Sequence, residues 1–231
     1  MKKILGLLTA LLLSAVAFAG SGWNNYLGFG WRIPTGTSLT VTEDGLPDDT
    51  EINMPLQTGI DFSYTGVNSK NGLSARAMAD FNVTTSDITG LDGENISGFN
   101  MDFLLGLGWA PIHSKSLVLG IYGIAGMDIV SFQDSSSTDT VASSKISTKN
   151  NWGYAAFIAG GNATLIWAPL ANRFSIFASV TMGYNFPSSV KKENETKTTI
   201  LGNTTTTTSS SSVDVSGAFK FIPSIGVSWR F

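Results

Sequence analysis

The sequence predicts an all-β fold, an eight-stranded antiparallel up-and-down β-barrel of the transmembrane kind. Three observations support this prediction. Eight segments alternate between apolar and polar residues, the connections between them are short and long in turn, and the six tryptophans lie at or near segment ends. Alternation shows that the two faces of a sheet meet different environments. The connections and the tryptophans indicate that one of these environments is lipid.

The eight segments are each at least as long as the about 9 to 11 residues that a tilted strand needs to cross a bilayer. In the first, at 23–33, Trp23, Leu27 and Phe29 alternate with polar and glycine residues. The others repeat the scheme at 52–64 (Ile60, Phe62), 73–84 (Phe81, Val83), 98–110 (Phe103, Leu105), 117–130 (Ile121, Met127), 152–167 (Trp152, Trp167), 174–186 (Phe174, Ile176) and 215–231 (Ile225, Val227). The sixth segment is irregular, because its two tryptophans have opposite parity. A β-bulge at Gly160–Gly161 would reconcile them by adding one residue to the alternation.

The connections sort by length. Those at 65–72, 111–116 and 168–173 are short, and those at 34–51, 85–97, 131–151 and 187–214 are long and polar. Short periplasmic turns and long extracellular loops are typical of outer-membrane barrels, so both termini are expected on the periplasmic side. The acidic stretch 42–51 and the Thr/Ser tract 204–212 are expected to be solvated. The tract has too little apolar area to fold alone.

Membrane insertion is also favoured by the aromatic residues and by the even number of segments. Tryptophan rings settle at the headgroup level, so tryptophans at both ends of the segments mark two interfaces. An even strand count lets the last strand pair with the first, which removes the free edge that lipid does not tolerate. A secreted soluble barrel or sandwich remains an alternative to the membrane barrel. Limited proteolysis of intact cells distinguishes the two.

The N-terminus and the composition predict an exported protein. Residues 1–19 combine Lys2 and Lys3, an apolar run and a small-residue end at Ala17-Phe18-Ala19, the layout of a secretory signal peptide. The barrel domain is therefore expected to span residues 20–231. The chain has no cysteine, and its net charge of -3 argues against nucleic acid as a partner, because no basic patch can neutralise phosphates.

The C-terminal segment ends in SIGVSWRF, with apolar residues alternating up to Phe231. With this ending and the pattern over 23–231, the chain resembles the small eight-stranded outer-membrane barrels, the family that includes the OmpA membrane domain, OmpX and OmpW. In that family a C-terminal aromatic residue is read by the barrel-assembly machinery. The resemblance therefore implies that Trp229 and Phe231 form an assembly signal. It implies a fold and no ligand site.

Seven charged residues fall on the inward phase of the predicted strands. Eight strands leave an interior that side chains fill, and buried charges there need partners. The sequence predicts Asp61 and Arg76 opposite each other in the inner half of the barrel. In the outer half Asp80 faces Asp102, which is unfavourable unless a cation reaches them. The complete predicted set of interior ion-pair residues is Arg32, Asp61, Arg76, Asp80, Asp102, Asp128 and Lys220.

The sequence predicts a non-enzymatic protein without cofactor or metal. The single histidine, His113, lies in a short turn beside Ser114, and neighbours along a chain do not form nucleophile–base geometry. The leading hypothesis is a structural or surface-interaction, adhesin-like protein of the bacterial outer membrane, with membrane lipid, the assembly machinery and extracellular or host molecules as partners. The alternative is a narrow, porin-like channel for small solutes, ions or apolar molecules, and a lateral opening between strands would mark the apolar variant.

Overall fold

The computed structural model describes residues 22–42, 50–87, 95–140, 144–169, 173–200 and 203–231. The expected signal peptide at 1–19 and most of the acidic stretch 42–51 lie outside the described residues. The described residues form ten strands: β1 Trp23–Thr42, β2 Thr50–Asn68, β3 Leu73–Asp87, β4 Asn95–His113, β5 Leu117–Thr140, β6 Ser144–Trp167, β7 Phe174–Asn185, β8 Ser188–Ile200, β9 Asn203–Val215 and β10 Ala218–Arg230.

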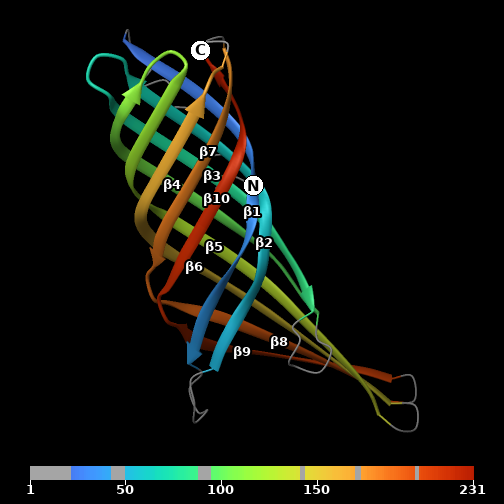
Figure 1. Ribbon diagram of the computed structural model, residues 1–231. Coiled ribbons are helices and arrows are strands. Elements are labelled where there is room, and N and C mark those ends of the chain that lie inside the picture. Colours follow the sequence, from blue (N-terminus) through green and yellow to red (C-terminus); the bar gives the residue numbers. More distant parts are fainter. Residues whose placement is uncertain (1–21, 43–49, 88–94, 141–143, 170–172, 201–202) are drawn as a thin grey trace.

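Eight of these strands form a closed barrel wall. β1 to β7 pair in sequence order, and β10 pairs with β7 on one side and with β1 on the other, all antiparallel. Figure 1 shows the tilted strands of this wall, with the short turns and the C-terminus gathered at one end. We call this the turn end and the opposite one the loop end. The predicted eight-stranded antiparallel barrel is confirmed.

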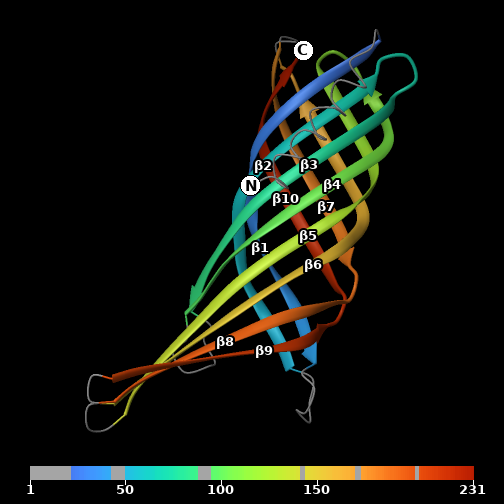
Figure 2. The same ribbon diagram turned by 180° about the vertical axis from the view of Figure 1, so that it is seen from behind.

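Two further strands, β8 and β9, correct the expectation that 187–214 is a solvated loop. β8 pairs with Ser144–Gly153 of β6, and β9 pairs with β8 along its full length. Together with the ends of β5 and β6 they form a four-stranded arm that projects beyond the barrel (Figures 1 and 2). The tract folds because β6 extends past the wall and offers β8 a free edge, while threonine suits extended backbone. The tract does not fold alone.

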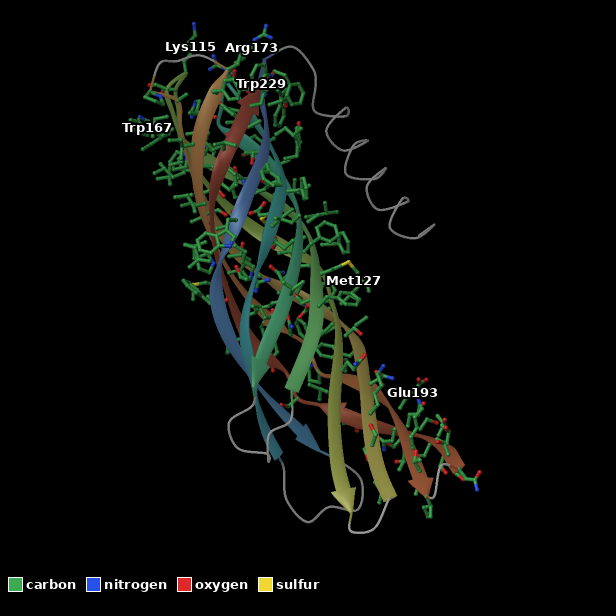
Figure 3. The ribbon with its side chains drawn as sticks, turned by 90° about the vertical axis from the view of Figure 1, so that its right-hand side faces the viewer. Lys115, Met127, Trp167, Arg173, Glu193 and Trp229 are labelled. Atoms are coloured by element: carbon green, nitrogen blue, oxygen red, sulfur yellow. The ribbon has the colours of Figure 1, made fainter. Side chains whose placement is uncertain are left out.

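The wall has an apolar outside and a mainly polar inside. Outward residues such as Phe29, Leu107 and Met182 are exposed, whereas inward residues such as Asn100 and Thr164 are buried. Figure 3 shows Met127 on the outer surface, and Trp167 and Trp229 near Lys115 and Arg173 at the turn end. Such an exposed apolar belt suits lipid and does not suit water. The soluble barrel or sandwich therefore does not describe this chain.

Aromatic rings reinforce the belt across neighbouring strands. Phe29, Phe62, Phe81 and Phe103 follow one another on β1 to β4 with edge-on ring centroids 5.2, 6.2 and 6.0 Å apart. Such cross-strand aromatic pairs stabilise a sheet beyond the area that they bury. They lie on the outward phase that the alternation of the sequence predicts.

The bulge predicted at Gly160–Gly161 is wrong. The β5–β6 ladder runs without interruption from Leu117↔Trp167 to Thr140↔Ser144, and the β6–β7 ladder is also regular. Positions 152 and 167 therefore lie on opposite phases of one continuous strand. The irregularities are elsewhere, in β1 between Arg32 and Thr37 and in β4 between Trp109 and Ile112.

The closure of the barrel depends on close backbone approach under one aromatic ring. Phe177 of β7 is buried and lies over Gly28, Gly30 and Gly226. A Cβ at position 226 would stand 2.3 Å from the Phe29 carbonyl oxygen and 2.7 Å from the Phe177 ring. Glycine is therefore required where β10 packs against β1.

Candidate functional site

The interior is built in layers. Six buried residues nearest the turn end form one apolar cluster, and five more form a second: Tyr26, Val67, Ala110, Val118, Ile166 and Phe177, then Met78, Leu104, Tyr122, Ile124 and Ile158. The predicted ion-paired interior did not include these apolar layers. Their signal in the sequence is an apolar residue on the otherwise polar phase, such as Leu104 between Asp102 and Gly106.

A charged cluster occupies the interior toward the loop end. Lys220 Nζ lies 2.6 Å from Asp102 Oδ1 and 3.1 Å from Asp128 Oδ1. Arg32 Nη1 lies 3.0 Å from Asp102 Oδ2. All four side chains are almost fully buried, so each charge has lost its water and depends on these partners. We call these four residues the lumen ion cluster.

Three asparagines connect the lumen ion cluster to the wall. Asn100 Oδ1 accepts hydrogen bonds from Lys220 Nζ at 3.2 Å and Asn82 Nδ2 at 3.1 Å, and its Nδ2 donates to Asp128. Asn185 Nδ2 donates to the second carboxylate oxygen of Asp128. These amides extend the network without adding charge. The sequence analysis did not identify these asparagines, because an asparagine at an inward-facing strand position cannot be distinguished by sequence from the other polar residues at such positions.

The predicted Asp61–Arg76 pair is wrong. Asp61 lies opposite Asp80, and Arg76 lies opposite Thr65, whose Oγ1 accepts a hydrogen bond from Arg76 Nη1 at 2.7 Å. Asp61 Oδ2 instead accepts a hydrogen bond from Ser224 Oγ at 2.7 Å. The prediction assumed a turn centred within 65–72.

The β2–β3 turn is tighter and later than assumed. The amide of Gly72, whose φ is 72°, donates to the carbonyl of Asn68 at 2.9 Å. The backbone amide of Lys70 donates to Asn68 Oδ1 at 2.9 Å. Asparagine and a left-handed glycine are the residues that such a turn favours, and their position shifts the register of the two strands.

Asp80 differs from the other interior carboxylates. It lies directly opposite both Asp61 and Asp102 in the two adjacent ladders. It is 3% exposed, and its Oδ1 has no hydrogen-bond partner. Arg32 and Lys220 both reach Asp102. Neither forms an ion pair with Asp80 among the described residues.

The structure places His113 in a structural position at the turn end. Its Nδ1 is 2.9 Å from the carbonyl oxygen of Ala110, three residues earlier. Among the described residues there is no group of three or more histidine, cysteine, aspartate or glutamate side chains that could hold a metal ion. The hydroxyl of the neighbouring Ser114 donates to the carbonyl oxygen of Leu117 at 3.1 Å.

The C-terminus is integrated into the wall at the turn end. Trp229 packs edge-on against Phe174 of β7, with ring centroids 4.4 Å apart. The amide of Phe231 donates to the carbonyl oxygen of Asn25 at 3.1 Å, and the Phe231 side chain stays exposed. The final strand thus has partners on both sides up to its last residue.

The arm has two chemically different faces. Paired positions share a face, so Lys149 of β6, Glu195 of β8 and Thr208 of β9 lie on one side, and Thr148, Thr196 and Thr207 lie on the other. On the charged face Lys197 Nζ lies 2.9 Å from Glu195 Oε1 and lowers the pKa of that carboxyl below its ordinary value. Figure 3 shows Glu193 on the same arm, away from the barrel body.

The faces of the arm continue the two sides of the wall. Odd-numbered positions of β6 face outward in the wall, as the exposed Phe157 and Leu165 show. Lys149 has the same parity, so the charged face continues the lipid-facing side. The other face continues the interior side and carries mostly threonine, serine and asparagine positions, with Lys192 and Asp134 at its barrel end.

Comparison with known proteins identifies the fold. No protein-family model and no curated protein matches the chain. Among solved structures, a major outer membrane protein from Thermus thermophilus matches with a TM-score of 0.58 at 12% identity, over 90% of this chain and 99% of that one. The chain has the fold of an outer-membrane β-barrel.

Two other solved structures match over a similar share of this chain. OprG from Pseudomonas aeruginosa matches with a TM-score of 0.46 and 15% identity over 91% of this chain and 96% of that one. Ail of Yersinia pestis, in complex with a heparin analogue, matches with a TM-score of 0.41 and 15% identity over 90% and 99%. Within the described residues no helix is long and apolar enough to cross a membrane.

Proposed function

We propose that this outer-membrane barrel does not conduct solutes through its interior and acts at the cell surface through its arm and long loops. The barrel then serves as a rigid, non-enzymatic membrane anchor. The observation that carries this proposal is the combination of a packed interior with a four-stranded arm that extends past the wall.

The contents of the interior support a non-conducting barrel. Two apolar clusters lie between the turn end and the lumen ion cluster. An ion that entered from the loop end would have to break the buried Lys220–Asp102 and Arg32–Asp102 pairs and then pass an apolar layer without water. Both steps are unfavourable, because a desolvated charge needs a partner.

The arm supports a surface-contact role. Residues Thr204–Ser210 of β9 are exposed and carry hydroxyl groups without charge, and each hydroxyl can both donate and accept a hydrogen bond. An exposed extended strand also presents backbone groups along its free edge. The arm therefore offers a polar platform for molecules outside the cell.

The orientation of the arm is tested by site-specific proteolysis on intact cells. A protease site inserted between β8 and β9 should be cut in intact cells, because the proposal places the arm outside. The matched control is the same site inserted at Lys115 in the β4–β5 turn, which should be cut only after the outer membrane is permeabilised. The reverse pattern would contradict the proposed orientation.

Surface contact is tested by removing the β8–β9 hairpin of the arm. Cells carrying a variant with Ser189–Asp214 replaced by two glycines should lose aggregation or adhesion to immobilised extracellular matrix relative to cells with the intact protein. Equal amounts of folded protein at the surface must be verified by gel mobility with and without boiling. Equal aggregation and adhesion of the two strains would contradict a contact role for the arm.

A lateral conduit is a second candidate, favoured by one observation at the closing seam. β1 and β10 pair through seven positions, from Tyr26↔Arg230 to Arg32↔Ser224. Toward the loop end both described strands continue, yet no further pair joins them. Pro223 lies directly beyond the last pair, and proline cannot donate a ladder hydrogen bond. Apolar molecules could leave the interior for the membrane at this seam.

The conduit is tested by restoring the missing donor. Pro223→Ala should extend the β1–β10 ladder and slow uptake of an apolar fluorescent dye into proteoliposomes. Pro187→Ala, outside the seam, is the control and should leave uptake unchanged. Wild-type uptake no faster than in protein-free liposomes would exclude the conduit and leave the non-conducting anchor.

A further inference from the structure

The carboxylates in the loop-end half of the interior outnumber the cations beside them. Four aspartates, Asp61, Asp80, Asp102 and Asp128, form one row of directly opposed positions on β2 to β5, and two basic residues, Arg32 of β1 and Lys220 of β10, reach this row. Both basic residues are engaged with Asp102 and Asp128. If all four aspartates are ionised, this row therefore carries two negative charges in excess, carried by Asp61 and Asp80.

These two carboxylates face each other and each has an oxygen without a partner. Asp61 lies directly across the β2–β3 ladder from Asp80, a position in which Cβ atoms are about 4.5 to 5.5 Å apart. Oδ1 of Asp61 and Oδ1 of Asp80 have no hydrogen-bond partner, and both side chains are at least 97% buried. Two like charges so placed repel each other unless something positive lies between them.

An independent acceptor points at the same place. Asn82 is the next inward residue of β3, is 2% exposed, and has an unpartnered Oδ1. Its Nδ2 donates toward β4, to Asn100 Oδ1 at 3.1 Å, so its Oδ1 points the other way, toward β2. There it lies 2.8 Å from the position that a Cβ of Gly59 would take, beside Asp61 on the same strand.

We propose that Asp61 and Asp80 bind one divalent cation inside the barrel, with Asn82 Oδ1 as an additional ligand. Carboxylate and amide oxygens are the ligands of hard cations, and Ca²⁺ accepts irregular sets of them. One divalent ion balances the two excess charges. A proton shared by the carboxylates satisfies that pair alone and leaves the amide oxygen of Asn82 without a donor.

The ligand set predicts weak binding. No cluster of three acidic or histidine side chains occurs in the described part of the chain, so two carboxylates, one amide and water complete the site. Sites with few charged ligands bind Ca²⁺ with dissociation constants on the order of 10⁻⁴ to 10⁻³ M. An ion held at this strength responds to the divalent cation concentration outside the cell.

The proposal is tested with the folded barrel in detergent micelles by equilibrium dialysis with radioactive Ca²⁺. The wild type should bind one Ca²⁺ per chain, and Asp80→Asn or Asp61→Asn should each weaken binding by at least about tenfold. Asn82→Ala keeps both carboxylates and should weaken binding less. Glu193→Gln removes an exposed carboxylate of the arm and serves as the matched control with unchanged binding.

Thermal unfolding gives a second measurement that separates the cation from a shared proton. Ca²⁺ should raise the unfolding temperature of the wild type relative to a chelator, and Asp80→Asn should abolish this rise. Gel mobility before heating verifies that each variant is folded. If a variant does not fold, the wild-type binding and unfolding measurements still test the proposal. A wild type that binds no Ca²⁺ and gains stability only on acidification would overturn the proposal.

Discussion

Lys220 of β10 donates to Asp102 of β4 at 2.6 Å, from one side of the barrel to the other. The two strands are four positions apart in either direction around the wall, so this contact spans the full interior. Asp102 also accepts from Arg32 of β1 at 3.0 Å. One carboxylate therefore joins three strands of the wall and closes the interior at that level.

Removing the lysine should destabilise the barrel strongly. Lys220→Met leaves Asp128 without its cation and Asp102 with one instead of two, and breaking a buried pair in this way costs about 3–5 kcal/mol. Urea unfolding in lipid vesicles measures the loss. Lys197→Met is the control, because the exposed Lys197–Glu195 pair of the arm is screened by water and should contribute far less to stability. Equal losses for both variants would contradict the buried ion cluster.

A methyl group at position 226 should impair closure of the barrel. In Gly226→Ala the added Cβ stands 2.3 Å from the Phe29 carbonyl oxygen and 2.4 Å from the Gly30 Cα, and backbone atoms of a paired strand cannot move aside cheaply. Gly123→Ala is the matched control, since its Cβ meets only one atom within 4 Å, at 4.0 Å. Gel mobility without boiling should show less folded Gly226→Ala than Gly123→Ala protein. Equal folded fractions would show that β1 and β10 do not need close approach.

The β8–β9 hairpin of the arm should be dispensable for folding of the barrel. Apart from the pairing of β8 with β9, the ladders of this hairpin are those with β6 and the two pairs Val41↔Val215 and Thr42↔Asp214. Replacing Ser189–Asp214 by two glycines should therefore change the midpoint of urea unfolding little. A large fall in the midpoint would show that the arm carries stability of the wall, and the adhesion comparison would then need a shorter deletion.

Parity along the strands predicted which residues enter the interior, because a strand alternates between two sides without reference to its partners. Arg32, Asp102, Asp128 and Lys220 are on that phase, and the structure brings them into contact. Parity did not predict the register between strands. Asp61 and Arg76 are not neighbours because the β2–β3 turn lies later in the sequence than a symmetric connection implies. The hydrogen bonds of Asn68 and Gly72 fix the position of this turn.

The arm could not be predicted from its own sequence. The segment KKENETK and the Thr/Ser tract have no apolar alternation, so they match the pattern of a solvated loop. Their strands form because Ser144–Gly153 of β6 provides an edge. The long connection 131–151 was itself expected to be a loop, and it is mostly the ends of β5 and β6.

The last residue should matter more for assembly than for stability. Phe231 is exposed at the turn end, where it contributes little buried area, and its backbone amide bonds Asn25 whatever the side chain is. Phe231→Ser should therefore refold from urea into lipid vesicles about as well as the wild type, and its level at the cell surface should fall. Phe219→Ser is the control at the loop end of β10, because it removes another exposed ring without altering the terminus. Equal surface levels of wild type and Phe231→Ser, measured by surface biotinylation of a tagged loop, would refute the assembly-signal hypothesis for Trp229 and Phe231.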